Sequence, residues 1–144
     1  MSETVHIVCP HCSAVNRMAA GRLGDRPNCG KCSDPLFTGR PIELSAAAFR
    51  KQMEHTDIPV LVDFWAAWCG PCQAMAPAFA AAAAKLEPQI RLAKVNTEEE
   101  QELAAQFGIR SIPALILFRN GREAARQAGA MSEADIIRWI RAYL

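Results

Sequence analysis

All six cysteines of this 144-residue chain fall into three Cys-x-x-Cys pairs. The pairs are CPHC at 9–12, CGKC at 29–32 and CGPC at 69–72. Two thiols at this spacing are close enough to bind one metal ion or to exchange one disulfide. In a reducing compartment such pairs indicate metal or redox chemistry more often than structural disulfides. The residues around each pair therefore have to indicate whether that pair binds metal or carries out redox chemistry.

Length and composition predict a globular protein with one main domain and a small appendage. Apolar residues make up 51% and charged residues 22%, and the net charge is +1. A charge this close to zero gives no general attraction to nucleic acid or to a membrane surface. The first residues lack the pattern of a signal peptide, and no later stretch has about 18 uninterrupted apolar residues. We therefore expect a cytoplasmic protein that does not enter a membrane.

Residues 1–40 are predicted to form a small metal-dependent module. They hold four of the six cysteines and only short apolar runs, so they cannot bury enough surface to fold alone. Cys9, Cys12, Cys29 and Cys32 have the spacing C-x2-C-x16-C-x2-C, which is typical of a four-thiolate zinc site. Each pair predicts a tight knuckle, and two knuckles close a tetrahedron of sulfurs. One zinc ion would supply the folding free energy that this segment lacks.

Two other interpretations of these four cysteines stay open. In the first, the four cysteines form structural disulfides, which a reducing cytoplasm disfavours. In the second, VCPHC at 8–12 is a second redox centre. The Pro-His dipeptide resembles that of strongly oxidising thiol enzymes, but no buried strand leads into it and no helix clearly starts from it. His6 and His11 are alternative ligands in principle, and we expect both to be exposed.

The charge of the module argues against nucleic acid as a partner. Residues 1–40 contain five basic and three acidic side chains, a balance of +2. Zinc with four thiolates contributes −2, so the module is close to neutral. It also lacks a basic patch rich in aromatic residues, and we expect no binding through phosphate charge.

From residue 42 onward, helix and strand patterns alternate, which predicts an α/β domain over residues 41–144. Strands are indicated by the buried run at 59–66 and by residues 90–96, and a hairpin at 114–129 has an Asn-Gly turn at 120–121. Helices are predicted after Ser45, at 71–86, at 97–108 and at 132–144. For the third helix, Thr97 and Glu100 form a capping-box pattern and Gly108 a stop. The expected architecture is a mixed sheet covered by helices.

The CGPC pair has the setting of a redox dithiol. Cys69 follows a buried strand, and Pro71 favours the start of a helix directly after it. A thiolate at a helix N-terminus is stabilised by the helix dipole, and the thiolate is the nucleophilic form. Cys72, one turn later, can then attack a mixed disulfide formed on Cys69. A metal knuckle is the alternative, but the flanking residues supply no further ligands.

Asp63 lies within the apolar strand, six residues before Cys69. If its side chain points inward, burial raises the pKa of its carboxyl group and makes it a proton acceptor. If it points outward, it is an ordinary exposed aspartate. The spacing alone favours neither.

The segments VDFWAAWCGPC at 62–72 and GIRSIPALILFRNG at 108–121 resemble the two signatures of the thioredoxin family. The resemblance covers residues 42–144. With the two N-terminal knuckles included, the whole chain resembles the zinc-containing bacterial class called thioredoxin 2. This resemblance implies a thioredoxin fold preceded by a zinc-ribbon-like module. It also implies a protein-disulfide reductase that a separate thioredoxin reductase recharges with NADPH. The chain itself shows no flavin or nicotinamide site.

The family pattern also implies roles for individual residues. Cys69 would be the nucleophile and Cys72 the resolving thiol. Asp63 would be the buried acid that exchanges a proton with Cys72, and Lys94 would be its neighbour. Pro113 would be a cis-proline facing the cysteines, and Trp65 would pack beneath the site. Ser111 stands where many thioredoxins have glycine. The substrate groove implied by the resemblance comprises Trp68, Gly70, Pro71, Ile112, Pro113 and Gly129.

Three functions follow from these observations. The first is a monomeric reductase of disulfides in other proteins. The second is a binding module, in which the zinc ribbon docks a partner and redox release of zinc acts as a switch. The third uses the same exchange chemistry as an oxidase or isomerase. Gly-Pro between Cys69 and Cys72 favours the reducing direction by analogy.

Overall fold

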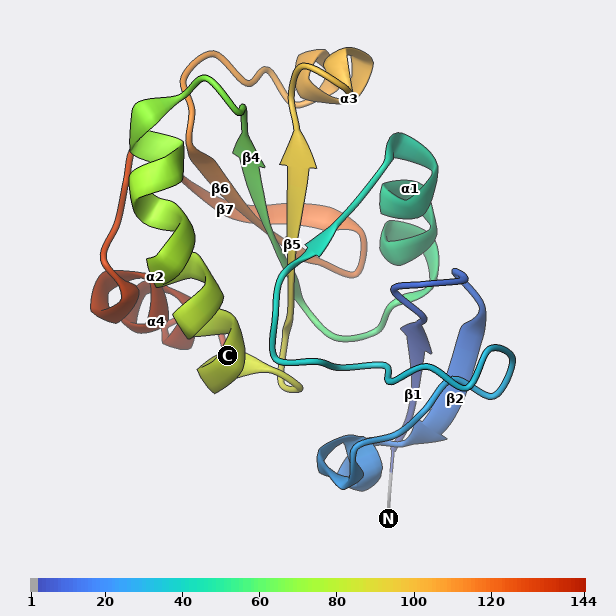
Figure 1. Cartoon of the computed structure of the whole chain (residues 1–144). Helices are drawn as coiled ribbons and strands as arrows, with labels where there is room; N and C mark the ends of the chain where they lie inside the picture. The colour runs from blue at the N-terminus through green and yellow to red at the C-terminus, as the bar shows by residue number, and fades with distance from the viewer. Residues whose placement is uncertain (1–2) are drawn as a thin grey trace.

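A five-stranded mixed sheet forms the centre of the computed structural model, which describes residues 3–144 (Figure 1). The strand order is β3-β5-β4-β6-β7. Strands β3 and β4 run parallel to β5, whereas β6 is antiparallel to β4 and β7 to β6. The strands are β3 (Ile42–Glu43), β4 (Val60–Trp65), β5 (Arg91–Asn96), β6 (Ala114–Arg119) and β7 (Arg122–Ala128).

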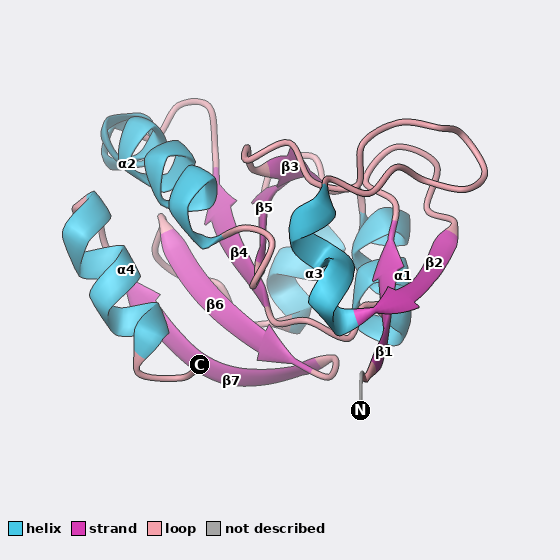
Figure 2. Cartoon of the chain, turned by 90° about the horizontal axis from the view of Figure 1, so that it is seen from below, coloured by secondary structure: helices cyan, strands magenta, loops and turns pink. Residues whose placement is uncertain are grey.

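Helices cover both faces of this sheet, two on each side (Figure 2). Helices α2 (Gly70–Leu86) and α4 (Glu133–Arg141) pack on one face, and α1 (Ala46–His55) and α3 (Gln101–Gln106) on the other. The side chains of β4 alternate between the two cores: Leu61 packs with α2, whereas Val62 and Phe64 pack with α1 and α3. The prediction of a strand buried on both faces is therefore confirmed, and so is the α/β architecture.

Local signals in the sequence explain two of the helix starts and the hairpin. Ser45 caps α1 by accepting a hydrogen bond from the Ala48 amide at 3.1 Å, and Ser132 caps α4 in the same way. Asn120 and Gly121 have φ values of 52° and 78°, as expected for a two-residue hairpin turn that needs positive φ at both positions.

The predicted start of the third helix is wrong. Helix α3 begins at Gln101, and Glu100 at its N-cap makes no side-chain capping bond. The Thr97 hydroxyl donates instead to the Trp65 carbonyl at 3.1 Å, and the Glu100 carboxylate accepts from the Ala46 amide at the start of α1, at 2.6 Å. Because both side chains have tertiary partners, no capping box forms. Gly108 does have the positive φ of a helix stop, at 62°.

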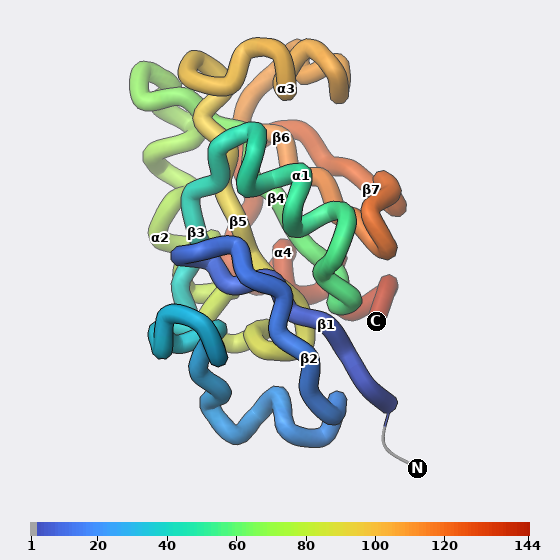
Figure 3. The backbone as a smooth tube through the Cα atoms, turned by 90° about the vertical axis from the view of Figure 1, so that its right-hand side faces the viewer, coloured from blue at the N-terminus to red at the C-terminus, as the bar shows by residue number. Residues whose placement is uncertain are grey.

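The N-terminal module consists of a hairpin, a 3-10 turn and two knuckles. Its regular elements are β1 (Thr4–Val8), β2 (Val15–Ala19) and η1 (Ala20–Asp25). The expectation that no buried strand leads into the first cysteine pair is wrong, because β1 ends in the buried Ile7 and Val8 directly before Cys9. The module lies below α1, at the end of the molecule away from α3 (Figure 3). Its small core of Ile7, Cys9, Cys29 and Leu36 is completed by Ile58, which lies two residues before the start of β4.

This shared core ties the module to the sheet. The Asp57 amide donates to the His6 carbonyl at 2.9 Å, and the Asp57 carboxylate accepts from the His6 amide at 2.7 Å. His6 is thus half-exposed and bonded to Asp57, and His11 is exposed. Residues after position 40 contribute one side chain to the core of the module and several hydrogen bonds to its backbone. We therefore expect the module and the sheet to unfold together.

Ile58→Ala is predicted to lower the free energy of unfolding by about 2–5 kcal/mol, because it leaves a cavity in the shared core. Urea unfolding at fixed free zinc, followed by far-UV circular dichroism, measures this change. Val15→Thr, at an exposed position of β2, is the control and should cost no more than about 0.5 kcal/mol. A loss below about 1 kcal/mol for Ile58→Ala would show that the module is not anchored through this side chain.

Candidate active site and metal centre

Cys69 and Cys72 form a disulfide at the N-terminus of α2, with their Cα atoms 5.2 Å apart. Cys69 is the N-cap residue, and its Sγ accepts a hydrogen bond from the Cys72 amide at 3.2 Å. Each cysteine is only 3% exposed, whereas the neighbouring Trp68 is 69% exposed. In the reduced protein the same amide and the positive end of the helix dipole would stabilise a Cys69 thiolate.

The loop before β6 approaches this dithiol from the other side. The Ile112–Pro113 peptide bond is cis, as the family resemblance implied, and the Ile112 carbonyl oxygen lies 3.7 Å from the Cys69 Sγ. Pro113 in turn accepts a hydrogen bond from the Gly129 amide at 2.9 Å. The structure thus brings Ile112, Pro113 and Gly129 together beside the cysteines. Gly70 and Pro71 are exposed at the helix start.

Asp63 is fully buried on the face of the sheet that α2 covers. Among the described residues, neither of its carboxylate oxygens has a hydrogen-bond partner. Burial raises the pKa of this carboxyl group to about 7; Lys94 opposes the shift and Glu43 adds to it. The inward orientation of Asp63 is the one required of a proton acceptor. A group with this pKa changes its protonation state near neutral pH.

Lys94 lies between two acidic residues in the strand register. It pairs with Asp63 on β4 and with Glu43 on β3, and its ammonium lies 4.4 Å above the Trp65 ring. Trp65 packs against the dithiol together with Ala66 and Ile112. Glu43 was not expected from the sequence, because a two-residue strand has no periodicity and only the pairing of β3 with β5 reveals its position.

The four remaining cysteines come together in the N-terminal module. All four Sγ atoms lie within 4.8 Å of one another, and the pairs Cys9–Cys32 and Cys12–Cys29 are each 3.6 Å apart. A zinc ion with bonds of about 2.3 Å requires sulfur–sulfur edges of about 3.8 Å. The spacing therefore fits a tetrahedral zinc site.

The backbone of each knuckle turns its amides toward the sulfurs. The His11 amide donates to the Cys9 Sγ and the Lys31 amide to the Cys29 Sγ, both at 3.4 Å. The Asn16 side chain adds a further donor to the Cys29 Sγ at 3.5 Å. Such donors stabilise thiolates, which are the form that binds metal.

The thiol pKa values diverge within this cluster. Hydrogen bonds from the Cys32 amide, then from Asn16 and Lys31, lower the pKa of Cys29 to about 6. The Asp34 amide lowers the pKa of Cys32, but burial and the three neighbouring thiols outweigh it and raise that pKa to about 12. Sulfurs this close cannot all ionise unless a cation binds between them.

Comparison with known proteins agrees with this geometry. Residues 40–142 match the family model described as Thioredoxin, and residues 8–34 match the model described as Thioredoxin 2, N-terminal, a zinc ribbon. The chain belongs to the thioredoxin family. It is accordingly a protein-disulfide oxidoreductase, with a thioredoxin domain and an N-terminal zinc-ribbon module.

Three curated relatives illustrate the extent of the match. Thioredoxin C-3 of Corynebacterium nephridii is 43% identical over 134 residues, which cover 93% of this chain and 92% of the relative. Thioredoxin 1 of Nostoc sp. is 38% identical over 71% of this chain and 95% of its own length. Thioredoxin of Haemophilus influenzae is 37% identical over 72% of this chain and 96% of its own length.

The helices of the structure were compared with the requirements for crossing a membrane. Within residues 3–144, no helix of this thioredoxin has both the length and the apolar character needed to span a bilayer.

Asp63→Asn is predicted to stabilise the oxidised protein above neutral pH. The folded-state pKa of Asp63, about 7, exceeds the ordinary value of 3.8, so folding favours the protonated carboxyl. The resulting stability is complete below about pH 4 and is lost as the pH rises through about 7. At pH 8.5 the ionised carboxylate costs up to about 4 kcal/mol, which asparagine avoids.

Urea unfolding of both oxidised proteins between pH 5 and 8.5, with the same metal content, measures this difference. The stability gap should widen with pH in favour of Asp63→Asn. A gap that stays constant across this range would show that Asp63 ionises at its ordinary pKa.

Proposed function

We propose that this thioredoxin is a protein-disulfide reductase in which Cys69 attacks and Cys72 resolves. The observation that carries the proposal is the position of Cys69. Its Sγ caps α2, accepts the Cys72 amide and faces the cis-Pro113 loop. The proposed groove for the substrate chain consists of Trp68, Gly70, Pro71, Ile112, Pro113 and Gly129.

Reduction takes place in two exchanges. The Cys69 thiolate attacks one sulfur of the substrate disulfide, a Cys69–substrate disulfide forms, and the other substrate sulfur leaves as a thiolate. The Asp63 carboxylate, held near Lys94, accepts the proton of the Cys72 thiol. The Cys72 thiolate then attacks the Cys69 sulfur and releases the second substrate thiolate. The substrate gains two electrons, and the enzyme is left with the Cys69–Cys72 disulfide.

Recharging requires an external donor of two electrons. We propose that a separate thioredoxin reductase supplies them from NADPH, so the chain needs no flavin or nicotinamide of its own. The partners are then this reductase and proteins with accessible disulfides, and the chain acts as a monomer. Nucleic acid is not among the proposed partners, because the net charge is only +1.

The N-terminal module is proposed to hold one Zn²⁺ through Cys9, Cys12, Cys29 and Cys32. Zinc has no redox chemistry of its own, and a four-thiolate site leaves no open position, so the ion contributes folding free energy and rigidity. Its four thiolates must stay reduced, which suits the cytoplasm. Zinc occupancy of the module is further proposed to tune redox behaviour or partner docking.

The two cysteine variants should fail at different steps. Cys72→Ser is predicted to accumulate a mixed disulfide with a disulfide-bonded protein substrate, because the attack succeeds and the resolution fails. Cys69→Ser should form no such adduct. Both should lose NADPH-coupled turnover with thioredoxin reductase by at least about 100-fold. Non-reducing electrophoresis and mass spectrometry detect the adduct, and absorbance at 340 nm follows NADPH.

Trapping through Cys72 in Cys69→Ser would reverse the two roles. Turnover that survives in Cys69→Ser would contradict the proposal that CGPC carries the reaction. Efficient oxidation of substrate thiols by the wild type, without turnover in the NADPH assay, would support an oxidase or isomerase instead.

A further inference from the structure

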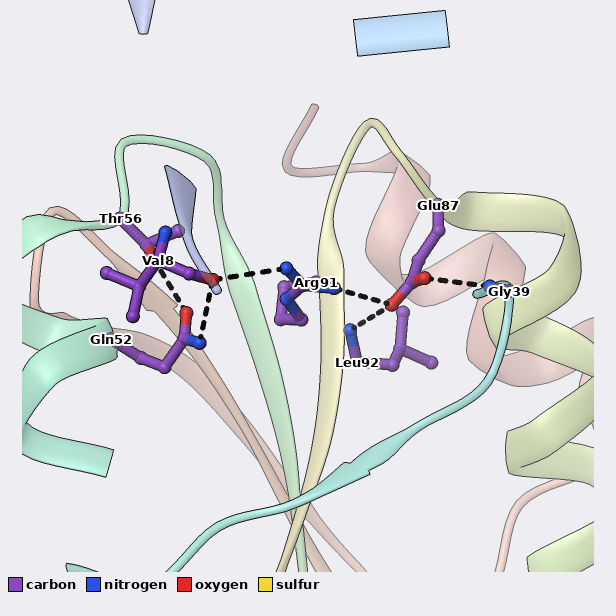
Figure 4. Close-up of polar contacts among 7 residues, drawn as sticks. All are labelled: Val8, Gly39, Gln52, Thr56, Glu87, Arg91 and Leu92. Carbon is purple, nitrogen blue, oxygen red and sulfur yellow. Dashed lines mark hydrogen bonds and ion pairs between the residues drawn. The ribbon is translucent and has the colours of Figure 1, made fainter. Parts of the chain in front are cut away.

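A buried polar junction joins the metal module to the sheet (Figure 4). The Val8 carbonyl, directly before the proposed ligand Cys9, accepts from the Arg91 Nη2 at 3.4 Å and from the Gln52 Nε2 at 3.3 Å. The Val8 amide donates to the Thr56 Oγ1 at 3.2 Å, and the Thr56 hydroxyl donates to the Gln52 Oε1 at 2.6 Å. Three side-chain hydrogen bonds thus fix the Val8 backbone at the start of the first knuckle, and the fourth links the Thr56 and Gln52 side chains to each other.

Arg91 is the unusual member of this junction. Its side chain is 0% exposed, it lies at the amino end of β5, and its guanidinium lies 4.4 Å above the Phe37 ring. Among the described residues, its Nε and Nη1 atoms have no hydrogen-bond partner. A buried cation requires anionic compensation, because burial without it costs several kcal/mol.

Glu87 compensates Arg91 only in part. The closest approach of the two groups is 3.7 Å, between the Arg91 Nη1 and the Glu87 Oε2. The same carboxylate also accepts from the Gly39 amide at 3.2 Å and from the Leu92 amide at 3.3 Å. Its negative charge is therefore shared with two backbone donors, and the guanidinium can accommodate a second anion.

The proposed zinc tetrathiolate is such an anion. Zinc with four thiolates carries a net charge of −2, and its ligand Cys9 is buried and adjacent to the residue that Arg91 binds. Burial lowers the pKa of Arg91, and the neighbouring Glu87 opposes this shift only in part. Charges in a buried site interact more strongly than the same charges in water.

We propose that Arg91 is a positioning residue of the metal centre, and that its buried charge and its bond to Val8 set how tightly the module holds zinc. The inference rests on the proposed zinc site and adds a residue from the thioredoxin sheet to it. Partners of this kind, outside the ligand set, typically change metal affinity by about 10–100-fold.

Chelator competition with the full-length chain tests the proposal, with zinc alone as the probe. Cys69 and Cys72 are both changed to serine, so that only the four module thiols remain. Arg91→Met, which keeps an unbranched side chain but removes the charge, should weaken zinc binding by about 10–100-fold. Glu87→Gln should tighten it, because it removes a buried negative charge that repels the tetrathiolate while the Arg91 charge stays in place.

Lys31→Met is the matched control. It removes one positive charge from between two proposed ligands, but at an exposed position, and should change zinc affinity by less than about threefold. Far-UV circular dichroism checks that each zinc-loaded variant is folded. If Arg91→Met does not fold, the direction of change in Glu87→Gln decides: tighter binding supports the proposal and weaker binding overturns it.

Two further results would overturn the inference. Zinc affinity of Arg91→Met within about threefold of the parent would show that Arg91 does not set it. Equal weakening by Arg91→Met and Glu87→Gln would show that packing, rather than charge, matters at the junction. A parent protein that binds no zinc at all would instead refute the proposed zinc site, and this result is distinguishable because it precedes any comparison of variants.

Discussion

Strand β4 is covered on both faces by helices and flanked on both edges by β5 and β6, and the rest of the site depends on this burial. An acidic residue at position 63 of such a strand cannot reach water, so its pKa must rise. The chain then leaves the sheet at Trp65 and enters α2 at Gly70. This short connection places Cys69 at the helix N-terminus and above the core that holds Asp63.

Strand β5 contributes to both chemical centres of the molecule. Arg91 at its amino end binds the module through Val8, and Lys94, three residues later, pairs with Asp63. At about 3.3 Å per residue, the backbones of these two positions are about 10 Å apart. The dithiol follows the carboxyl end of β4, whereas the module contacts the amino ends of β4 and β5 (Figure 1). The two centres therefore both involve β5 but lie at opposite ends of the sheet.

Periodicity and motifs predicted much of this arrangement, because they depend on neighbouring residues. The apolar run of β4, the Ser45 cap and the Asn120-Gly121 turn each have a local physical cause, and each is confirmed. The cis-Pro113 bond had no local signal and came only from family resemblance. The burial of Asp63 could not be decided from spacing, since a strand can present a residue to either face.

The failures have a common reason. Thr97 and Glu100 have the residue types of a capping box, but tertiary partners at Trp65 and Ala46 take their side chains. Glu43, Glu87 and Arg91 carry no motif at all. Their roles arise from contacts between segments far apart in sequence, such as the contact between Val8 and Arg91, whose residue numbers differ by 83. A sequence pattern does not contain this information unless the fold is known.

The central claim is that two of the six cysteines carry out disulfide exchange and the other four bind zinc. Differential alkylation read by mass spectrometry tests this claim most directly. The reduced, zinc-loaded protein is labelled with and without a chelator, and again after a disulfide substrate is added. The account predicts that Cys69 is alkylated first, that only Cys69 and Cys72 become oxidised by substrate, and that Cys9, Cys12, Cys29 and Cys32 react only after chelation. Oxidation of Cys9 and Cys12 during turnover would contradict it and make the module a second redox centre.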